Sequence, residues 1–170
     1  MTKDFRHVPL KLYERVYASS KTVTIFKIVD RISVILSAGC FVALLYLAFL
    51  RGIMDAVLLA GMAAVPFVIV SGLRMVLKSE RPYEVIDFSR FSEEPPHRKR
   101  GASFPSRHVF SAFLIAFLAF EYAWYVGAVC ILFGVALAIS RVALGIHFIK
   151  DVVCGAVIGM ASGIVGMLIL

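Results

Sequence analysis

The sequence has long stretches with no charged residue at all, and this absence decides its broad class. Residues 32–50 contain no Asp, Glu, Lys or Arg, and neither do the runs 56–73, 122–140 and 152–170. Overall, 61% of the residues are hydrophobic, which is well above the share in a typical soluble domain. Uncharged runs of this length suffice to cross a bilayer as helices. We therefore expect an all-α, polytopic membrane helix bundle.

Cysteine and acidic residues are also scarce. Cys40, Cys130 and Cys154 all lie inside apolar runs without a Cys-x-x-Cys spacing, so we interpret them as small buried hydrophobic side chains. Lys and Arg outnumber Asp and Glu by 18 to 11, which gives a formal net charge of +7. In a membrane protein such an excess usually lies in loops beside anionic headgroups. The expected partner is thus the lipid bilayer and not nucleic acid.

About five transmembrane helices and one amphipathic helix are expected. The spans are predicted over residues 32–50, 54–77, 105–121, 122–141 and 149–170. Residues 1–31 mix apolar side chains with charges that would be costly to bury in lipid, so we predict an N-terminal amphipathic interfacial helix there. Residues 32–170 then form the membrane domain. A polar loop over 78–104, which carries the basic run 97–100, joins its second and third spans.

The distribution of basic residues predicts which side these loops face. With five spans, the 1–31 segment and the 78–104 and 141–151 loops share one side of the membrane. That side carries every Lys and Arg except Arg51, so the positive-inside rule places it in the cytoplasm. Short loops and the lack of a signal-peptide pattern favour the inner membrane of a bacterium. The sequence leaves the oligomeric state open.

Three polar clusters lie at the ends of predicted spans. They are Arg74-x6-Arg81-Pro82, Pro105-Ser106-Arg107-His108 and Ser140-Arg141-x5-His147-x3-Asp151. Because of the span count, all three are expected to meet at the same membrane face. Arg side chains present planar forks that suit phosphate oxygens. A helix that starts at Ser106 would add free backbone N–H groups, which favour an anion.

The same clusters hold the residue types of nucleophilic catalysis. His108 and His147 offer a nucleophile and a proton donor near neutral pH. Asp151, four residues after His147, could hold the tautomer of the imidazole if both lie on one helix face. Cations outnumber metal-ligand side chains in these clusters, so neither a metal ion nor another cofactor is expected.

The order and spacing of the three clusters resemble the signature of the type 2 phosphatidic acid phosphatase family, also called lipid phosphate phosphatases. The family pattern is Lys-x6-Arg-Pro, then Pro-Ser-Gly-His, then Ser-Arg-x5-His-x3-Asp, and the resemblance covers residues 74–151. It implies a metal-independent hydrolase that passes phosphate through a phosphohistidine. The family commonly has six spans, so the span that this chain lacks by our count would be N-terminal.

The resemblance also implies a role for each matching residue. His147 resembles the family nucleophile, Asp151 its orienting carboxylate, and His108 the acid that protonates the departing lipid oxygen. The implied phosphate-binding residues are Arg74, Arg81, Ser106, Arg107, Ser140 and Arg141. Two of these depart from the pattern, since Arg74 stands at the lysine position and Arg107 at the glycine position. Arg107 adds a cation that would suit a second phosphate or an acidic headgroup.

The expected function is hydrolysis of a phosphomonoester or diphosphate headgroup on a membrane lipid. A cytoplasmic site would fit phosphatidylglycerophosphate or phosphatidate as substrate. An undecaprenyl diphosphate phosphatase is the alternative enzyme, and it would need a site on the outer face. A non-catalytic lipid-binding protein is a second alternative, although such a protein would usually lose one of the two histidines. An anion transporter is disfavoured because no charge lies in the middle of a predicted span.

Overall fold

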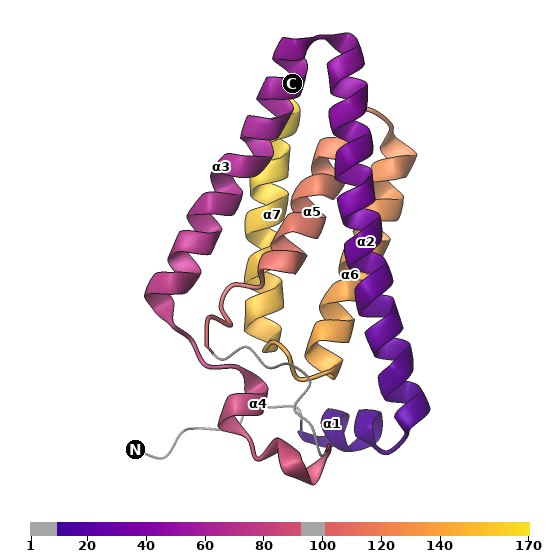
Figure 1. Ribbon diagram of the computed structural model, residues 1–170, viewed down its shortest axis with the longest axis vertical. Coiled ribbons are helices and arrows are strands. Elements are labelled where there is room, and N and C mark those ends of the chain that lie inside the picture. Colours follow the sequence, from indigo (N-terminus) through magenta and orange to yellow (C-terminus); the bar gives the residue numbers. More distant parts are fainter. Residues whose placement is uncertain (1–9, 93–100) are drawn as a thin grey trace.

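The protein is a bundle of long α-helices with a layer of short helices at one end (Figure 1). The computed structural model describes residues 10–92 and 101–170, so the basic run 97–100 and the first part of the 1–31 segment lie outside the described residues. The elements are α1 (Leu10–Tyr17), α2 (Ser20–Arg51), α3 (Ile53–Leu77), α4 (Pro82–Val85), the 3-10 helix η2 (Phe88–Arg90), α5 (Arg107–Phe120), α6 (Trp124–Ala143) and α7 (Ile149–Ile169). Every described element is helical, which confirms the all-α class.

Four of the described helices can cross a membrane by length and composition, namely α2, α3, α6 and α7. Their outward faces carry large apolar side chains. Val68, Leu132 and Leu168, for example, are all exposed. An apolar surface of this extent is stable against lipid but not against water. The chain is therefore a multi-pass helical membrane protein, as the uncharged runs predicted.

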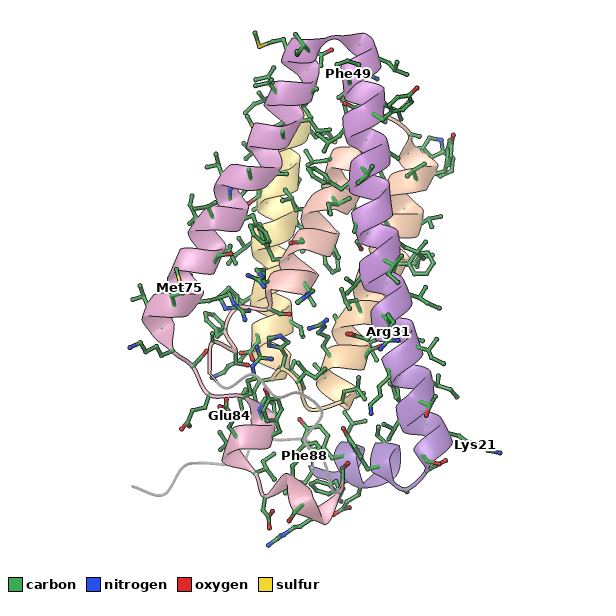
Figure 2. The ribbon with its side chains drawn as sticks, in the orientation of Figure 1. Lys21, Arg31, Phe49, Met75, Glu84 and Phe88 are labelled. Carbon is green, nitrogen blue, oxygen red and sulfur yellow. The ribbon has the colours of Figure 1, made fainter. Side chains whose placement is uncertain are left out.

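α2 differs from the expected boundaries because it begins at Ser20 and not near residue 32. Only α1 is a separate helix in the described part of the 1–31 segment, and the charged residues Lys21, Lys27 and Arg31 belong to α2. A helix of 32 residues rises about 48 Å, which exceeds the roughly 30 Å of a hydrocarbon core. The charged part of α2 can thus lie outside the core. Figure 2 shows Lys21 near the lower end of α2, directed away from the bundle.

α5 occupies the middle of the bundle, with α2, α3, α6 and α7 packed around it (Figure 1). It corresponds to the expected span 105–121 but has only 14 residues, which rise about 21 Å. Nine of the 14 are buried. Because neighbouring helices cover its sides, α5 does not have to match the thickness of the lipid core.

A row of glycines on α7 allows α5 and α7 to pack at very short range. The row consists of Gly155, Gly159, Gly163 and Gly166. A Cβ atom added at any of them would lie closer than 3.0 Å to an atom of α5 or its N-cap Ser106. Small residues at this spacing let two helix backbones approach closely inside a membrane. As a result, the start of α7 lies directly beside the start of α5.

α1 lies across the lower end of the bundle (Figure 1). A layer of aromatic side chains closes this end. Tyr13 and Tyr17 of α1 pack against Phe88 and Phe91, with ring centroids 5.3–6.5 Å apart. The hydroxyl of Tyr17 donates to the carbonyl of Leu144, 3.2 Å away, in the turn between α6 and α7. This aromatic layer therefore contacts and supports the turn that carries His147.

The glycine row yields a stability prediction. Gly159→Ala should lower the free energy of unfolding by roughly 1–3 kcal/mol, because the added Cβ would press on the carbonyl of Phe110. The measurement is the thermal unfolding midpoint of the detergent-solubilised protein. Gly61→Ala on α3 is the matched control, since its Cβ would meet nothing within 4 Å and alanine favours the helix. Equal midpoints for the two variants would contradict the tight α5–α7 contact.

Candidate active site

The three polar clusters of the sequence come together at the lower end of the bundle, where nitrogen and oxygen atoms gather in Figure 2. Arg81 is the N-cap of α4, Ser106 is the N-cap of α5, and Asp151 lies in the first turn of α7. His147 lies in the turn between α6 and α7. The backbone N–H of Ser106 donates to the carbonyl of Asp151, 2.9 Å away, which joins the second cluster to the third.

His147 and Asp151 form a buried pair with a third partner, Ser103. The imidazole Nδ1 lies 3.5 Å from Asp151 Oδ2 and 3.3 Å from the hydroxyl of Ser103. The Ser103 hydroxyl donates to the same Oδ2, and the backbone N–H of Phe148 donates to it from 3.0 Å. His147 and Asp151 are 1% and 0% exposed, so bulk water does not compete for these contacts. The arrangement directs Nδ1 toward the carboxylate, so Nε2 is the ring nitrogen on the side away from it.

Burial is the main influence on the charge of His147. It lowers the pKa of the imidazole to about 4, and the positive charges of Arg81 and Arg141 act in the same direction. The contact with the Asp151 carboxylate opposes this shift without overcoming it. The imidazole is therefore neutral at ordinary cellular pH, which is the form that can act as a nucleophile.

The start of α5 presents an unsatisfied polar surface. The Ser106 hydroxyl oxygen is buried and has no hydrogen-bond partner among residues 10–92 and 101–170. Free N–H groups of the first helical turn lie next to it and carry the positive end of the helix dipole. His108 lies in this same turn, half-buried, within electrostatic range of His147. An anion at this point would satisfy groups that are otherwise left unpaired.

Arg81 and Arg74 are both bound to the backbone that leads into α5. Arg81 Nε donates to the carbonyl of Gly101, 3.1 Å away, and Arg74 donates to the carbonyls of Ala102 and Pro105. Glu84 accepts from the backbone N–H groups of both Arg81 and Gly101, at 2.7 and 2.9 Å. In this structure Arg74 therefore anchors the 101–106 segment, whereas the sequence suggested only a phosphate contact.

Arg141 is held by an acid from α2. Its Nε lies 2.8 Å from Asp30 Oδ1, and its Nη2 donates to Asp30 Oδ2 at 3.2 Å. The Arg141 side chain is 7% exposed, so this pairing provides the counter-charge that a buried guanidinium requires. Its remaining N–H groups are available to a ligand. Ser140 is buried, and its hydroxyl donates back to the carbonyl of Ala136 within α6, so it can only accept from a ligand.

Two further basic residues, in the first turns of α5 and α7, each contact an aromatic ring. The Arg107 guanidinium stacks over the ring of Phe67, 5.4 Å from its centroid, and the Lys150 ammonium lies 5.5 Å from the ring centroid of Phe148. Both contacts leave the charge accessible to an anion. In the described parts of the chain, no group of three or more His, Cys, Asp or Glu is arranged to hold a metal ion.

Three residues at this site were not singled out in the sequence, namely Ser103, Glu84 and Asp30. Ser103 lies three positions before Ser106 and shares its cluster in space, so its proximity could have been noticed. Asp30 offers the weaker signal of a single acid next to a long apolar run. Glu84 carries no signal, because its partners are backbone groups.

Buried arginines, a histidine and a carboxylate at the end of a lipid-facing helix bundle are the residue types that phosphoryl transfer uses. Comparison with known families indicates the same chemistry. The family model described as "PAP2 superfamily" matches residues 55–170, which is more than half of the chain. The chain belongs to the PAP2 superfamily, as a membrane lipid phosphatase. The resemblance seen in the three clusters is thereby confirmed.

Two solved structures are similar to this chain. The crystal structure of Aquifex aeolicus LpxE matches with a TM-score of 0.71 and 21% identity, over 99% of each chain, so the two share a fold. A transmembrane PAP2-type phosphatidylglycerolphosphate phosphatase from Bacillus subtilis matches with a TM-score of 0.47 and 20% identity, over 96% of each chain. The comparison with curated proteins gave no match.

The Asp30–Arg141 pair predicts a specific stability defect. Asp30→Ala should lower the free energy of unfolding by roughly 2–4 kcal/mol, because it leaves the buried Arg141 without its counter-charge. Adding Arg141→Met should restore part of the loss. Unfolding in detergent measures both effects. Glu121→Ala is the control, since its ion pair with Arg51 is 3.8 Å long between side chains that are 33% and 47% exposed, and it should matter little. No recovery in the double variant would show that Asp30 acts in some other way.

Proposed function

We propose that this chain hydrolyses a phosphate ester or diphosphate on a membrane lipid through a phosphohistidine at His147. The observation that supports this most directly is the buried, neutral imidazole, whose Nδ1 faces Asp151 while Nε2 is left for the phosphorus. A nucleophile of this kind requires an orienting acceptor on its other nitrogen. The proposal uses no metal ion, because the arginines supply the positive charge.

The chemistry proceeds in two steps that balance without a further reactant. His147 Nε2 forms a bond to phosphorus as the bond from phosphorus to the lipid oxygen breaks, and that oxygen takes a proton from His108. A water molecule then returns its proton to His108 and attacks the phosphohistidine, which releases phosphate and the free imidazole. His108 suits this role because it lies in the first turn of α5, beside the proposed phosphate site.

The phosphate would be held between the start of α5 and the buried arginines. Arg81 and the free N–H groups of Arg141 would bind two of its oxygens, and Ser106 with the first turn of α5 would bind the third. Arg107, the first residue of α5, would contact a second acidic group of the substrate. Arg74 would support this cradle through the loop. Ser140, whose hydrogen is given to Ala136, would accept from the P–OH of a singly protonated phosphate.

A lipid rather than a soluble phosphate ester is favoured by an apolar cavity next to the site. The cavity has a volume of about 520 Å³ and lies between α2, α3 and α5, with Phe41, Leu45, Phe67 and Leu114 among its lining residues. Phe67 also carries the guanidinium of Arg107 over its ring, so the cavity adjoins the start of α5, where Arg107 lies. An acyl chain in this cavity would place its headgroup near His147.

The substrate we favour is phosphatidylglycerophosphate or phosphatidate, at a site that faces the cytoplasm of a bacterial cell. This orientation rests on the basic residues of the site end and on Arg51 as the single cation expected at the other end. We further propose five spans, formed by the apolar part of α2 from residue 32, α3, α5, α6 and α7. α1 would then lie at the interface, ahead of a membrane domain over 32–170.

Separate roles for the two histidines can be tested by trapping the phosphoenzyme in acid. His147→Ala should abolish all trapped label. His108→Ala should still be labelled, but roughly 10²- to 10⁴-fold more slowly with a lipid substrate, because the leaving oxygen lacks its proton donor. The loss of rate in His108→Ala should be smaller with p-nitrophenyl phosphate, because its leaving group needs little protonation. Label on His147→Ala but not on His108→Ala would reverse the two assignments.

The orientation of the site can be tested by cysteine labelling in intact bacterial cells, in a background without the native cysteines. Arg90→Cys lies at the site end with a side chain that is 76% exposed, and Arg51→Cys lies at the opposite end, 47% exposed. A membrane-impermeant maleimide should label Arg51→Cys and fail to label Arg90→Cys until the cells are broken. The reverse pattern would place the site outside and make a polyprenyl diphosphate the favoured substrate.

A further inference from the structure

Ser103 lies between the two members of the proposed catalytic pair. Its side chain is fully buried, donates its hydroxyl hydrogen to Asp151 Oδ2, and places its oxygen 3.3 Å from His147 Nδ1. The direct distance from Nδ1 to Oδ2 is 3.5 Å, which is longer than a normal hydrogen bond. The serine hydroxyl is therefore the nearer of the two oxygens to the imidazole.

The position of Ser103 is fixed by contacts that do not involve its own side chain. Its backbone N–H donates to the carbonyl of Ser79 at 2.9 Å, and the next N–H, of Phe104, donates to the Ser79 hydroxyl at 2.6 Å. The carbonyl of Ala102, on its other side, accepts from Arg74. Because the backbone is anchored on both sides of Ser103, these backbone contacts hold its hydroxyl beside His147 and Asp151. The position of the hydroxyl therefore does not depend only on its own hydrogen bonds.

The hydrogen count of the serine determines the direction of the contacts. A hydroxyl has a single hydrogen, and Ser103 gives it to the carboxylate, so only its lone pairs can face the imidazole. The neutral imidazole must then carry its proton on Nδ1 and donate it to Ser103 Oγ. This leaves the lone pair on Nε2, which is the tautomer that attack on phosphorus requires.

We propose that Ser103 is a positioning residue that links His147 to Asp151, so that the carboxylate acts on the imidazole through the serine hydroxyl. The proposal rests on the proposed function, because it assigns the reacting nitrogen to His147. When Nε2 bonds to phosphorus the ring becomes positively charged, and the polarised hydroxyl between ring and carboxylate stabilises that charge. Asp151 Oδ1 has no hydrogen-bond partner within the described residues, so loss of the serine would leave this carboxylate still less satisfied.

The test measures phosphoenzyme formation by acid quench, with p-nitrophenyl phosphate and a lipid phosphate as substrates. Ser103→Ala should slow the step by roughly 10- to 100-fold with KM nearly unchanged, as expected for an outer partner that orients a reacting histidine. Ser103→Thr, which keeps the hydroxyl, should retain most of the rate. Ser37→Ala is the matched control, because that hydroxyl only donates within α2, to the carbonyl of Ser33.

A double-variant cycle separates positioning from general support of the fold. If Ser103 acts through Asp151, then Ser103→Ala combined with Asp151→Asn should be no slower than Asp151→Asn alone. The inference would be overturned if the rate losses of the two single variants multiplied in the double variant. It would also be overturned if Ser103→Ala were as fast as the wild type. Should Ser103→Ala fail to fold, Ser103→Cys keeps nearly the same volume with a weak donor. It should be slow as well, and a full rate for it would also overturn the inference.

The same experiment keeps the two proposals apart. If the wild-type enzyme hydrolyses phosphate esters without trapping label, or if label persists in His147→Ala, the proposed function fails whatever Ser103 does. If the wild type traps label on His147 and the Ser103 variants behave like Ser37→Ala, only the role of Ser103 is wrong.

Discussion

The close contact between α5 and α7 is the constraint on which the rest of the structure depends. Because Gly155 and Gly159 have no side chains, the two helix backbones approach until the Ser106 N–H bonds the carbonyl of Asp151 at 2.9 Å. The proposed anion-binding start of one helix and the His147–Asp151 pair at the start of the other thus become one site. α2, α3 and α6 then pack around this core. Arg141 and Arg74 reach the site from α6 and α3.

Local patterns in the sequence were enough to predict the class and most of the architecture. A helix that crosses lipid must be continuously apolar, so α3, α6 and α7 could be located to within a few residues from their uncharged runs. The spacing of Arg141, His147 and Asp151 also pointed to the family. These residues are close in sequence, so a local motif was enough to predict that they lie near one another. The start of α2 was missed, because charged residues can continue a helix beyond the membrane.

The contacts that complete the site could not be predicted, because they join residues that are distant in sequence. Asp30 and Arg141 are 111 positions apart, and Ser103 and Asp151 are 48 apart. Asp30 and Ser103 are single polar residues that belong to no periodic pattern or motif. Asp30 also lies on α2, outside the matched family region 55–170. The contacts of Arg74 with the backbone could not be predicted for a related reason. Its partners are backbone carbonyls, and a sequence does not reveal which carbonyls a fold will leave free.

The proposed binding of an acyl chain in the apolar cavity between α2, α3 and α5 would also affect the kinetics of the enzyme. Its lining includes Val42, which is 65% exposed on α2, so the cavity is bordered by the surface that faces lipid. A substrate whose tail enters there reaches the enzyme by diffusion within the plane of the membrane. Its effective concentration is then its mole fraction in the bilayer, and adding inert lipid slows turnover although no substrate has been removed. A short-chain ester in solution does not experience this surface dilution, so the two kinds of substrate obey different rate laws at one site.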